Sequence, residues 1–407
     1  MAEAPAWARD ARQTATANLD ALPELTGTEE EWRFTAPELL GLSGPAPADA
    51  TATAAPLPAD RGRRSARLDI TDGTAGAVAV ESLPDGVIVA ELGQALTDHE
   101  ELVREHLYSL IGFDDRPGAV NAAQWSAGTF VYVPDGVTLE IPTETSLVAS
   151  GAQGRVDART LVVVGAGAKA TVVDRYTSAD LGSPVAVSTA VELVVLPEGE
   201  LEHVAVVDWG AGVRHHARVT ASAHKDARVR SVMVTLGGDV VRVEATMVAS
   251  GPGSDSRALG VYFADGNQHF EHRVVSRHEA PQAYSNLLYK GALKDTAHTV
   301  FFGNLVVPPG APGTDAYQTN RNLVLNDGAR ADTIPFLEIA TAEVKCSHAG
   351  AVGRVDDEHL FYLTSRGVPT EIAKRLIVIG FLQEVLEQVR FEDLRTELEH
   401  AVAEKLA

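Results

Sequence analysis

A run of more than 200 residues, from about 121 to 352, most constrains the fold of this chain. Short segments rich in Val and Thr recur along this run and are separated by turns such as Pro-Asp-Gly and Pro-Glu-Gly. No stretch of ten residues within it has a convincing helical period. So many strands without intervening helices exclude a doubly wound α/β fold. A large β-sandwich, a β-propeller or a β-solenoid remains.

The spacing of the strands favours one of these three. They follow one another closely, and no blade-length repeat with a signature dipeptide is visible. Val-rich strands with small residues at the turns favour a parallel β-helix, in which each rung stacks on its neighbours. We therefore expect a β-helix core over 121–353, after a mainly helical N-terminal domain over 1–120 and before a helical C-terminal domain over 354–407. An Ala/Pro-rich segment at about 44–64 is predicted to be a linker.

The C-terminal domain carries clear helix signals. Asp356 and the two acidic residues after it predict the first turn of one helix, and Gly367 predicts its end. Pro369 fits the first turn of a second helix, whose apolar side chains run from 372 to 389. That apolar face covers so much of the helix that it needs cover from its own domain or from a partner.

Composition narrows the classes of partner and compartment. The chain has 56 acidic and 34 basic residues, a formal net charge of −22, which argues against a nucleic-acid partner. Its single cysteine excludes an intramolecular disulfide. The N-terminus lacks the pattern of a signal peptide, and no apolar run of about 18 residues predicts a membrane span. These features predict a soluble, cytoplasmic protein.

The sole cysteine lies two positions before a histidine, in a segment that reads as a β-strand. Strand side chains alternate between faces, so Cys346 and His348 are expected to project from the same side. A thiolate and an imidazole are suitable ligands for iron, zinc or an iron–sulfur cluster. Two ligands make half a metal site, and the alternative is an inert, buried cysteine.

Two other motifs favour structural roles. The loop from Gly165 to Lys169 imitates a dinucleotide-binding loop, but strand-like residues follow it where a helix is required, so a tight turn between strands is expected. His269 and His272 miss the two-histidine zinc-protease spacing by one residue and would face opposite sides of a strand. With His278 they could form part of a metal site, although structural or surface histidines are favoured.

Several blocks of sequence occur in a consistent order from about 121 to 389. They are NAA at 121–123, VYVPDG at 131–136, GNQH at 266–269, QTNRNLVL at 318–325, ADTIPFLEI at 331–339, VKCSH at 344–348 and HLFYLTSRG at 359–367. Together they resemble the SufB/SufD family of the SUF iron–sulfur cluster assembly system. The first 100 residues match that family only loosely.

Within that family, the chain is more similar to the D-type subunit, SufD. A B-type subunit carries a cluster-building cysteine shortly after the Gln-Asn block, where this chain has none. A B-type subunit also has an acidic His-Glu-Ala-Thr run where this chain has Cys346-Ser347-His348. The D-type pattern continues with Gly-Ala-Thr, whereas Ala349-Gly350-Ala351 follows here, so the ligand pair is kept and the threonine is lost.

The resemblance implies a right-handed parallel β-helix flanked by N- and C-terminal helical domains. It also implies a SufBCD complex of one SufB-like subunit, one SufD-like subunit and two copies of the SufC ATPase. The β-helix ends would pair near Cys346 and His348, and the C-terminal helices would dock SufC. His348 matches the histidine of a nascent-cluster or iron site shared with SufB, and Cys346 is its neighbour.

By that resemblance the chain is a non-enzymatic scaffold, and no cofactor is expected in the isolated chain. It has no Gly-Lys-Ser/Thr phosphate loop for ATP. Edge strands near Cys346 also allow a homodimer when the SufB partner is absent. The alternatives are a B-type scaffold paralogue, a β-helix polysaccharide-active enzyme, or a self-contained metalloenzyme that uses His269, His272 and His278.

Overall fold

The computed structural model describes residues 4–43 and 62–406. Helices that precede the strand-rich region are α1 (Ala6–Ala21), the 3-10 helices η1 (Glu30–Trp32) and η2 (Pro37–Leu40), α2 (Leu92–Asp98), α3 (Glu100–His106) and α4 (Arg116–Gln124). Helices that follow it are α5 (Asp357–Thr364), α6 (Thr370–Leu386) and α7 (Glu392–Lys405). The strands are β1 (Ala66–Thr71), β2 (Thr74–Ala75), β3 (Ala79–Val80), β4 (Ile88–Glu91), β5 (Ala127–Val133), β6 (Thr143–Ala149), β7 (Arg155–Val164), β8 (Lys169–Ser178), β9 (Val185–Val195), β10 (Glu200–Asp208), β11 (Val213–Ala223), β12 (Arg228–Thr235), β13 (Val240–Ala249), β14 (Asp255–Ala264), β15 (His269–His278), β16 (Tyr284–Leu293), β17 (His298–Val307), β18 (Asp315–Val324), β19 (Arg330–Ile339) and β20 (Lys345–Gly353).

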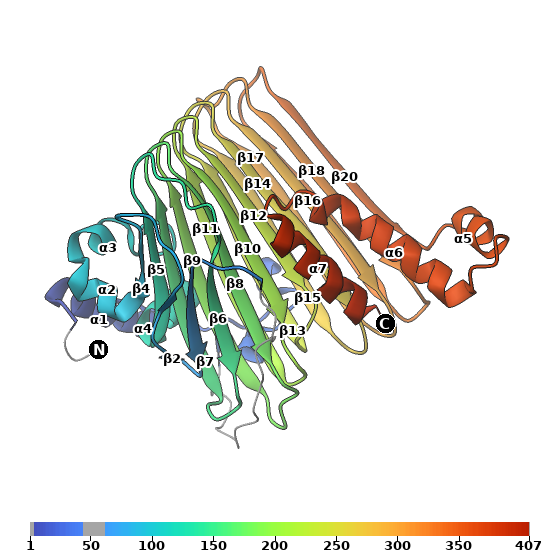
Figure 1. Ribbon diagram of the computed structural model, residues 1–407, viewed down its shortest axis with the longest axis horizontal. Helices are drawn as coiled ribbons and strands as arrows, with labels where there is room; N and C mark the ends of the chain where they lie inside the picture. The colour runs from blue at the N-terminus through green and yellow to red at the C-terminus, as the bar shows by residue number, and fades with distance from the viewer. Residues whose placement is uncertain (1–3, 44–61, 407) are drawn as a thin grey trace.

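The strands form two sheets that stack as the two walls of a parallel β-helix (Figure 1). Sheet A runs from β1 through the even-numbered strands β6 to β20, and sheet B runs from β4 through the odd-numbered strands β5 to β19. Successive strands from β5 onward alternate between the sheets, and each pairs in parallel with the strand two positions along the chain. The predicted parallel β-helix is therefore confirmed, and the sandwich and propeller alternatives are wrong.

The lumen between the sheets holds the main apolar core. Alternate residues of each strand point into it, and most are Val, Leu and Ala, which fill the narrow space between the walls. Tyr262 and Tyr289 also lie there, and each pairs in register with a glycine of the neighbouring strand, Gly291 and Gly260. A Cβ atom on Gly291 would lie 1.8 Å from the Tyr262 ring, so the missing side chain makes room for the aromatic one.

The helices cover the outer faces of the two sheets. The N-terminal helices α2 and α3 pack on sheet B around Phe130 and Leu161, and α6 and α7 pack on sheet A around Val204 and Leu259. These contacts bury much of the apolar face predicted between 372 and 389 within the chain itself. The N-terminal helices and the C-terminal helices thus stabilise opposite walls of the β-helix.

Buried ion pairs anchor both groups of helices. On sheet B, Arg159 and Glu192 pair at 2.8 Å with both side chains fully buried, and Glu192 also accepts hydrogen bonds from the backbone N–H groups of Tyr108, Leu110 and Ile111. The carboxylate therefore fixes the segment between α3 and α4. A charged pair buried this completely needs all of these hydrogen bonds to offset the loss of water.

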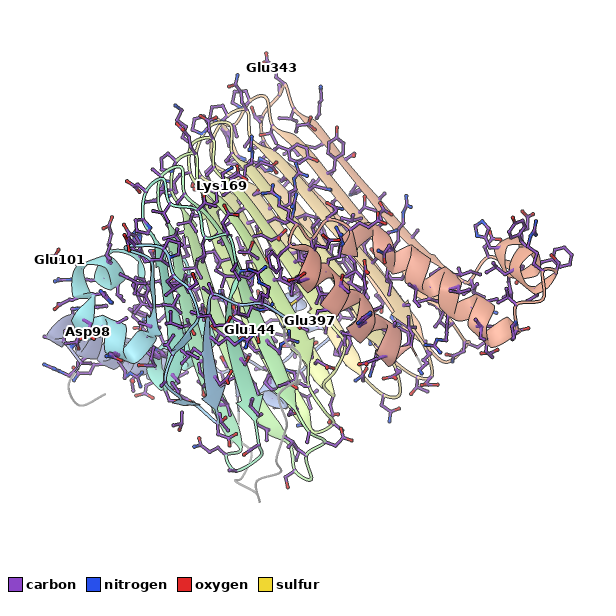
Figure 2. All side chains as sticks on the ribbon, viewed as in Figure 1. Asp98, Glu101, Glu144, Lys169, Glu343 and Glu397 are labelled. Carbon is purple, nitrogen blue, oxygen red and sulfur yellow. The ribbon has the colours of Figure 1, made fainter. Side chains whose placement is uncertain are left out.

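A second network joins the first rung to α7. Arg64 donates to Glu144 of β6 at 2.8 Å and to Glu397 of α7 at 2.9 Å, and Arg175 of β8 also pairs with Glu397. Figure 2 labels Glu144 on sheet A and Glu397 on α7, the two carboxylates that Arg64 joins. The segment that follows residue 61 is thereby tied to the C-terminal helices.

Gly165 begins a tight turn between β7 and β8, closed by the Ala168 N–H donating to its carbonyl at 3.1 Å, so the predicted turn is confirmed. Asp356 caps α5 through the N–H groups of Glu358 and His359, as its acidic first turn predicted. The predicted linker at about 44–64 falls on residues that lie almost entirely outside the described ones. Across residues 4–43 and 62–406, none of the helices has the length and apolarity to cross a membrane.

Candidate functional site

The β-helix ends at β19 and β20, whose outer edges have no strand beside them among the described residues. β19 pairs with β17 and β20 pairs with β18, each on one side. The other end of the stack is covered by the N-terminal elements, where β4 pairs with β5 and α2 packs on it (Figure 1). The C-terminal end therefore presents two rows of free backbone N–H and C=O groups, which is the geometry that accepts a further strand.

Cys346 and His348 lie on β20, within this open rung. Their register partners on β18 are Ala316 and Gln318, which are buried with exposed fractions of 0% and 1%. Cys346 packs against the lumen core, whereas His348 is exposed. By strand alternation both residues belong to the row that faces the lumen, as the sequence predicted for a shared face.

The electrostatics of the open rung disfavour a free thiolate. Burial is the main cause that raises the pKa of the Cys346 thiol, and the carboxylate of Asp315 raises that pKa further. The thiol is thus protonated near neutral pH, and metal binding would have to displace its proton. Nowhere in the part of the chain that the structure describes do three His, Cys, Asp or Glu side chains come close enough to hold a metal ion. Cys346 and His348 therefore do not complete a metal site with any third ligand among the described residues, and a site that used them would need ligands from elsewhere.

Apolar side chains accompany these donors at the open rung. Leu337 of β19 and Val352 of β20 are 36% and 47% exposed, and their register partners Leu305 and Asn322 are buried. On the outer face of β19, Phe336 is 42% exposed and packs against the ring of Phe302 at a tilt. An uncovered apolar rung with free edges is typical of a surface that another protein covers.

The three histidines of the alternative metal site form no three-ligand group within the described part of the chain, and His278 bonds the Ser285 hydroxyl at 2.8 Å. His269 lies on the outer face of sheet B, where its ring bonds Thr35 at 2.8 Å. His272 points into the lumen, bonds Thr235 at 3.0 Å and stacks on Tyr262. The opposite orientation of His269 and His272 confirms the prediction from strand alternation, and both side chains serve packing and hydrogen bonding.

One chain of hydrogen-bonded polar side chains in the lumen was not predicted from the sequence. Asp174 bonds His203 at 3.0 Å, and His203 bonds Ser231 at 3.1 Å, in the carboxylate–imidazole–hydroxyl order of a serine hydrolase. The exposed fractions of the three residues are only 1%, 0% and 5%, so no substrate reaches the hydroxyl. The three residues lie 29 and 28 positions apart on adjacent strands, and only a known strand register would have brought them together.

A comparison with protein families identifies the chain. The family model "SUF system FeS cluster assembly, SufBD core domain" matches residues 147–381, which is more than half of the 407 residues and includes the whole open rung. The chain belongs to the SufBD family. Membership in this family links the chain to iron–sulfur cluster assembly and to the SUF system.

Similarity to curated SufBD proteins supports the same family assignment. A Mycobacterium leprae protein named as an iron–sulfur cluster assembly SufBD family protein is 46% identical over 224 residues, which cover 53% of this chain and 57% of that protein. A Mycobacterium tuberculosis relative of the same description is 38% identical over 310 residues, 72% of this chain and 74% of its own length. A Staphylococcus epidermidis SufBD family protein is 27% identical over 309 residues, 75% of this chain and 66% of its own length.

Proposed function

We propose that this chain is a non-enzymatic, D-type scaffold subunit of a cytoplasmic SufBCD complex. In this proposal its open rung pairs with a SufB-like subunit, and His348 contributes to a cluster or iron site shared between the two. The observation that carries the proposal is the coincidence, on one uncovered rung, of free strand edges, exposed apolar side chains and the Cys346–His348 pair. Because the chain belongs to the SufBD family, the chemistry proposed for this rung is iron–sulfur cluster assembly.

The role proposed for His348 follows from its surroundings. His348 is exposed, and a neutral imidazole binds iron without losing a proton from its metal-binding nitrogen. Cys346 is half-buried, and the pKa of its thiol is raised, so it is the poorer ligand of the two. We therefore assign the donor role to His348 and a supporting position to Cys346.

The SufC ATPase is proposed to dock on the outer surface of α5 and α6. Val378 and Leu382 of α6 are buried against sheet A, whereas Ile372 and Leu376 of the same helix are 50% and 49% exposed. Figure 1 shows α5 projecting away from the β-helix beyond the start of α6. Phe361 of α5 is 73% exposed. Apolar side chains displayed in this way on a projecting helix pair suit a protein partner.

Replacing both Ile372 and Leu376 with Asp is expected to abolish retention of the ATPase in a pulldown. Each change places a carboxylate in an apolar contact, which costs about 2 kcal/mol or more. Retention of the SufB-like subunit by the same variant should be unchanged, because the open rung lies on other elements. Undiminished retention of the ATPase would move its docking surface elsewhere on the chain.

The experiment that tests the proposed function is co-purification. A tagged form of this chain is produced alone and together with a SufB-like protein and a SufC-like ATPase from the same organism, and each preparation is analysed for subunits, iron and sulfide. The proposal predicts a stable complex that gains iron and sulfide, and little metal on the chain alone. Stoichiometric metal on the isolated chain, or failure to bind either protein, would contradict the proposal.

A further inference from the structure

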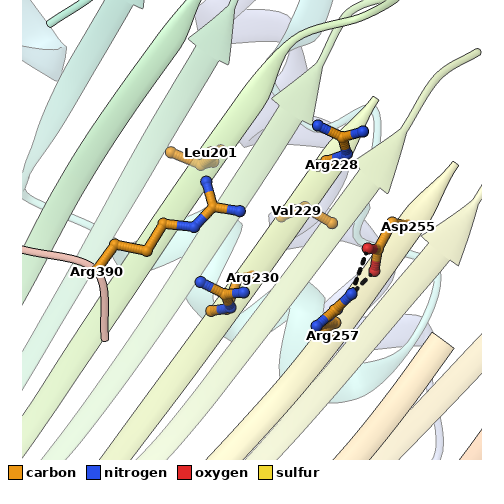
Figure 3. Close-up of a pocket in the computed structure, with 7 residues that line it drawn as sticks. All are labelled: Leu201, Arg228, Val229, Arg230, Asp255, Arg257 and Arg390. Atoms are coloured by element: carbon orange, nitrogen blue, oxygen red, sulfur yellow. Dashed lines mark hydrogen bonds and ion pairs between the residues drawn. The ribbon is translucent and has the colours of Figure 1, made fainter. Parts of the chain in front are cut away.

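The outer face of sheet A carries a group of arginines beside the turn between α6 and α7. Arg228 and Arg230 come from β12, Arg257 comes from β14 and Arg390 comes from the turn (Figure 3). Register places Arg230 next to Arg257, and Arg228 next to Asp255. In a chain with a formal net charge of −22, four guanidinium groups around one spot form an unusual local surplus of cations.

Within residues 4–43 and 62–406, the carboxylates that pair with these arginines are too few to neutralise them. Glu200 is shared by Lys169, Arg228 and Arg390, with N–O distances of 3.1, 3.2 and 2.9 Å. Glu202 pairs with Arg230 at 3.4 Å, and Asp255 pairs with Arg257 at 2.7 Å. These ion pairs join five cationic side chains to three carboxylates.

Arg230 shows the effect of that imbalance most directly. Its Nε atom is buried and has no hydrogen-bond partner among the residues that the structure describes, whereas its Nη1 atom donates to the carbonyl of Gln388 at 3.1 Å. Burial lowers the pKa of Arg230, and the charge of Arg390 lowers it further. A buried N–H without an acceptor, among guanidinium groups that repel one another, is a group that an added anion would satisfy.

The space between these side chains fits one atom of such an anion. The cavity that the four arginines line with Leu201, Val229 and Asp255 has a volume of about 10 Å³, which is room for one water-sized group. The guanidinium forks match the oxygens of a tetrahedral oxyanion, which they can bind with two parallel hydrogen bonds. We propose that Arg228, Arg230, Arg257 and Arg390 form a binding site for a phosphate-type oxyanion, with one of its oxygens in the cavity and the others at the surface.

Titration with inorganic phosphate tests this site on the full-length chain. Isothermal titration calorimetry is run at constant ionic strength, with chloride replacing phosphate in the reference. Wild type is expected to bind phosphate saturably at millimolar concentrations. Arg257→Gln should weaken phosphate binding roughly 10- to 100-fold, because it removes a charge-assisted donor from the rim. Arg277→Gln, at an exposed arginine of β15 in the other sheet, is the matched control and should bind as wild type does.

Three results would overturn the proposal. They are no saturable heat with wild type up to about 20 mM phosphate, equal binding by Arg257→Gln and wild type, and an equal loss in the Arg277→Gln control. Arg257 is 31% exposed, so its substitution should leave the fold intact, and Arg390→Gln from the turn serves as a second variant. The test uses no partner protein, so its outcome is independent of the proposed SUF complex.

Discussion

Leu337→Asp is expected to abolish pairing of this chain with a SufB-like subunit while the chain itself stays folded. Leu337 lies in the lumen-facing row of the last rung and is 36% exposed, because no further rung covers it. A partner that continues the β-helix would bury this side chain together with Val352 and the free edges of β19 and β20. An aspartate buried there costs about 2–4 kcal/mol, which weakens pairing roughly 30- to 700-fold.

The measurement for Leu337→Asp is the fraction of SufB-like subunit retained by the tagged chain, with ATPase retention recorded in the same experiment. Val80→Asp, at a residue of β3 that is 56% exposed, places the same charge at an apolar position far from the open rung in the sequence and should pair as wild type does. The ATPase should remain bound to both variants. Normal pairing by Leu337→Asp would show that the last rung is not the partner interface.

Lowering the pH from 7 to 5 is expected to destabilise the chain by several kcal/mol. Burial lowers the pKa of His215 and His272 to about 3 and that of His278 to about 4. Burial, followed by the nearby ring of His298, lowers the pKa of His269 to about 4. In the unfolded chain these groups titrate near 6.5, so between pH 6.5 and 4 the unfolded state binds more protons than the folded state. Stability is therefore full above pH 6.5 and falls as the pH drops, by about 2 kcal/mol per histidine at pH 5.

This prediction is checked by urea unfolding at pH 7 and pH 5. His272→Phe should reduce the difference in unfolding free energy between the two pH values by about 2 kcal/mol, whatever it does to stability at pH 7. His400→Gln removes an exposed histidine of α7 and serves as the matched control for His272→Phe. The raised pKa values of buried Asp157 and Glu202, which desolvation causes, act in the opposite direction. Stability that stays constant or rises between pH 7 and pH 5 would contradict the expectation.

The fold was predictable from the sequence because its strands repeat without helices. A Val-rich, nearly continuous apolar segment such as Val185–Val195 indicates a strand that is buried on both faces, which suits a wall between a lumen and covering helices. The rung register was not predictable. One column of stacked residues consists of Lys169, Glu200, Arg228 and Asp255, and successive members lie 31, 28 and 27 positions apart in the sequence. The strands therefore repeat without a fixed period that the sequence could reveal.

The candidate site was predictable only in part, because strand alternation can be inferred from the sequence but the register of the rungs cannot. Strand alternation alone predicts that Cys346 and His348 share a face. The sequence does not show where the solenoid stops. It therefore could not predict that their strand is the last in sheet A, or that the shared face is the lumen side. Two other features join residues of neighbouring rungs. They are the hydrogen-bonded series Asp174–His203–Ser231 and the group of arginines around Arg230. No pattern within one strand reveals such contacts.

Cluster loading of the co-purified complex tests the central claim most directly. The complex is reconstituted anaerobically with iron and sulfide, and its iron–sulfur absorbance is measured for wild type, His348→Ala and Ser347→Ala. Ser347 is the exposed neighbour on the opposite face of β20, which makes it the matched control. A shared site at the open rung predicts that wild type and Ser347→Ala gain the cluster, while His348→Ala assembles with its partners but gains little. Equal loading of all three complexes would contradict the role proposed for the open rung.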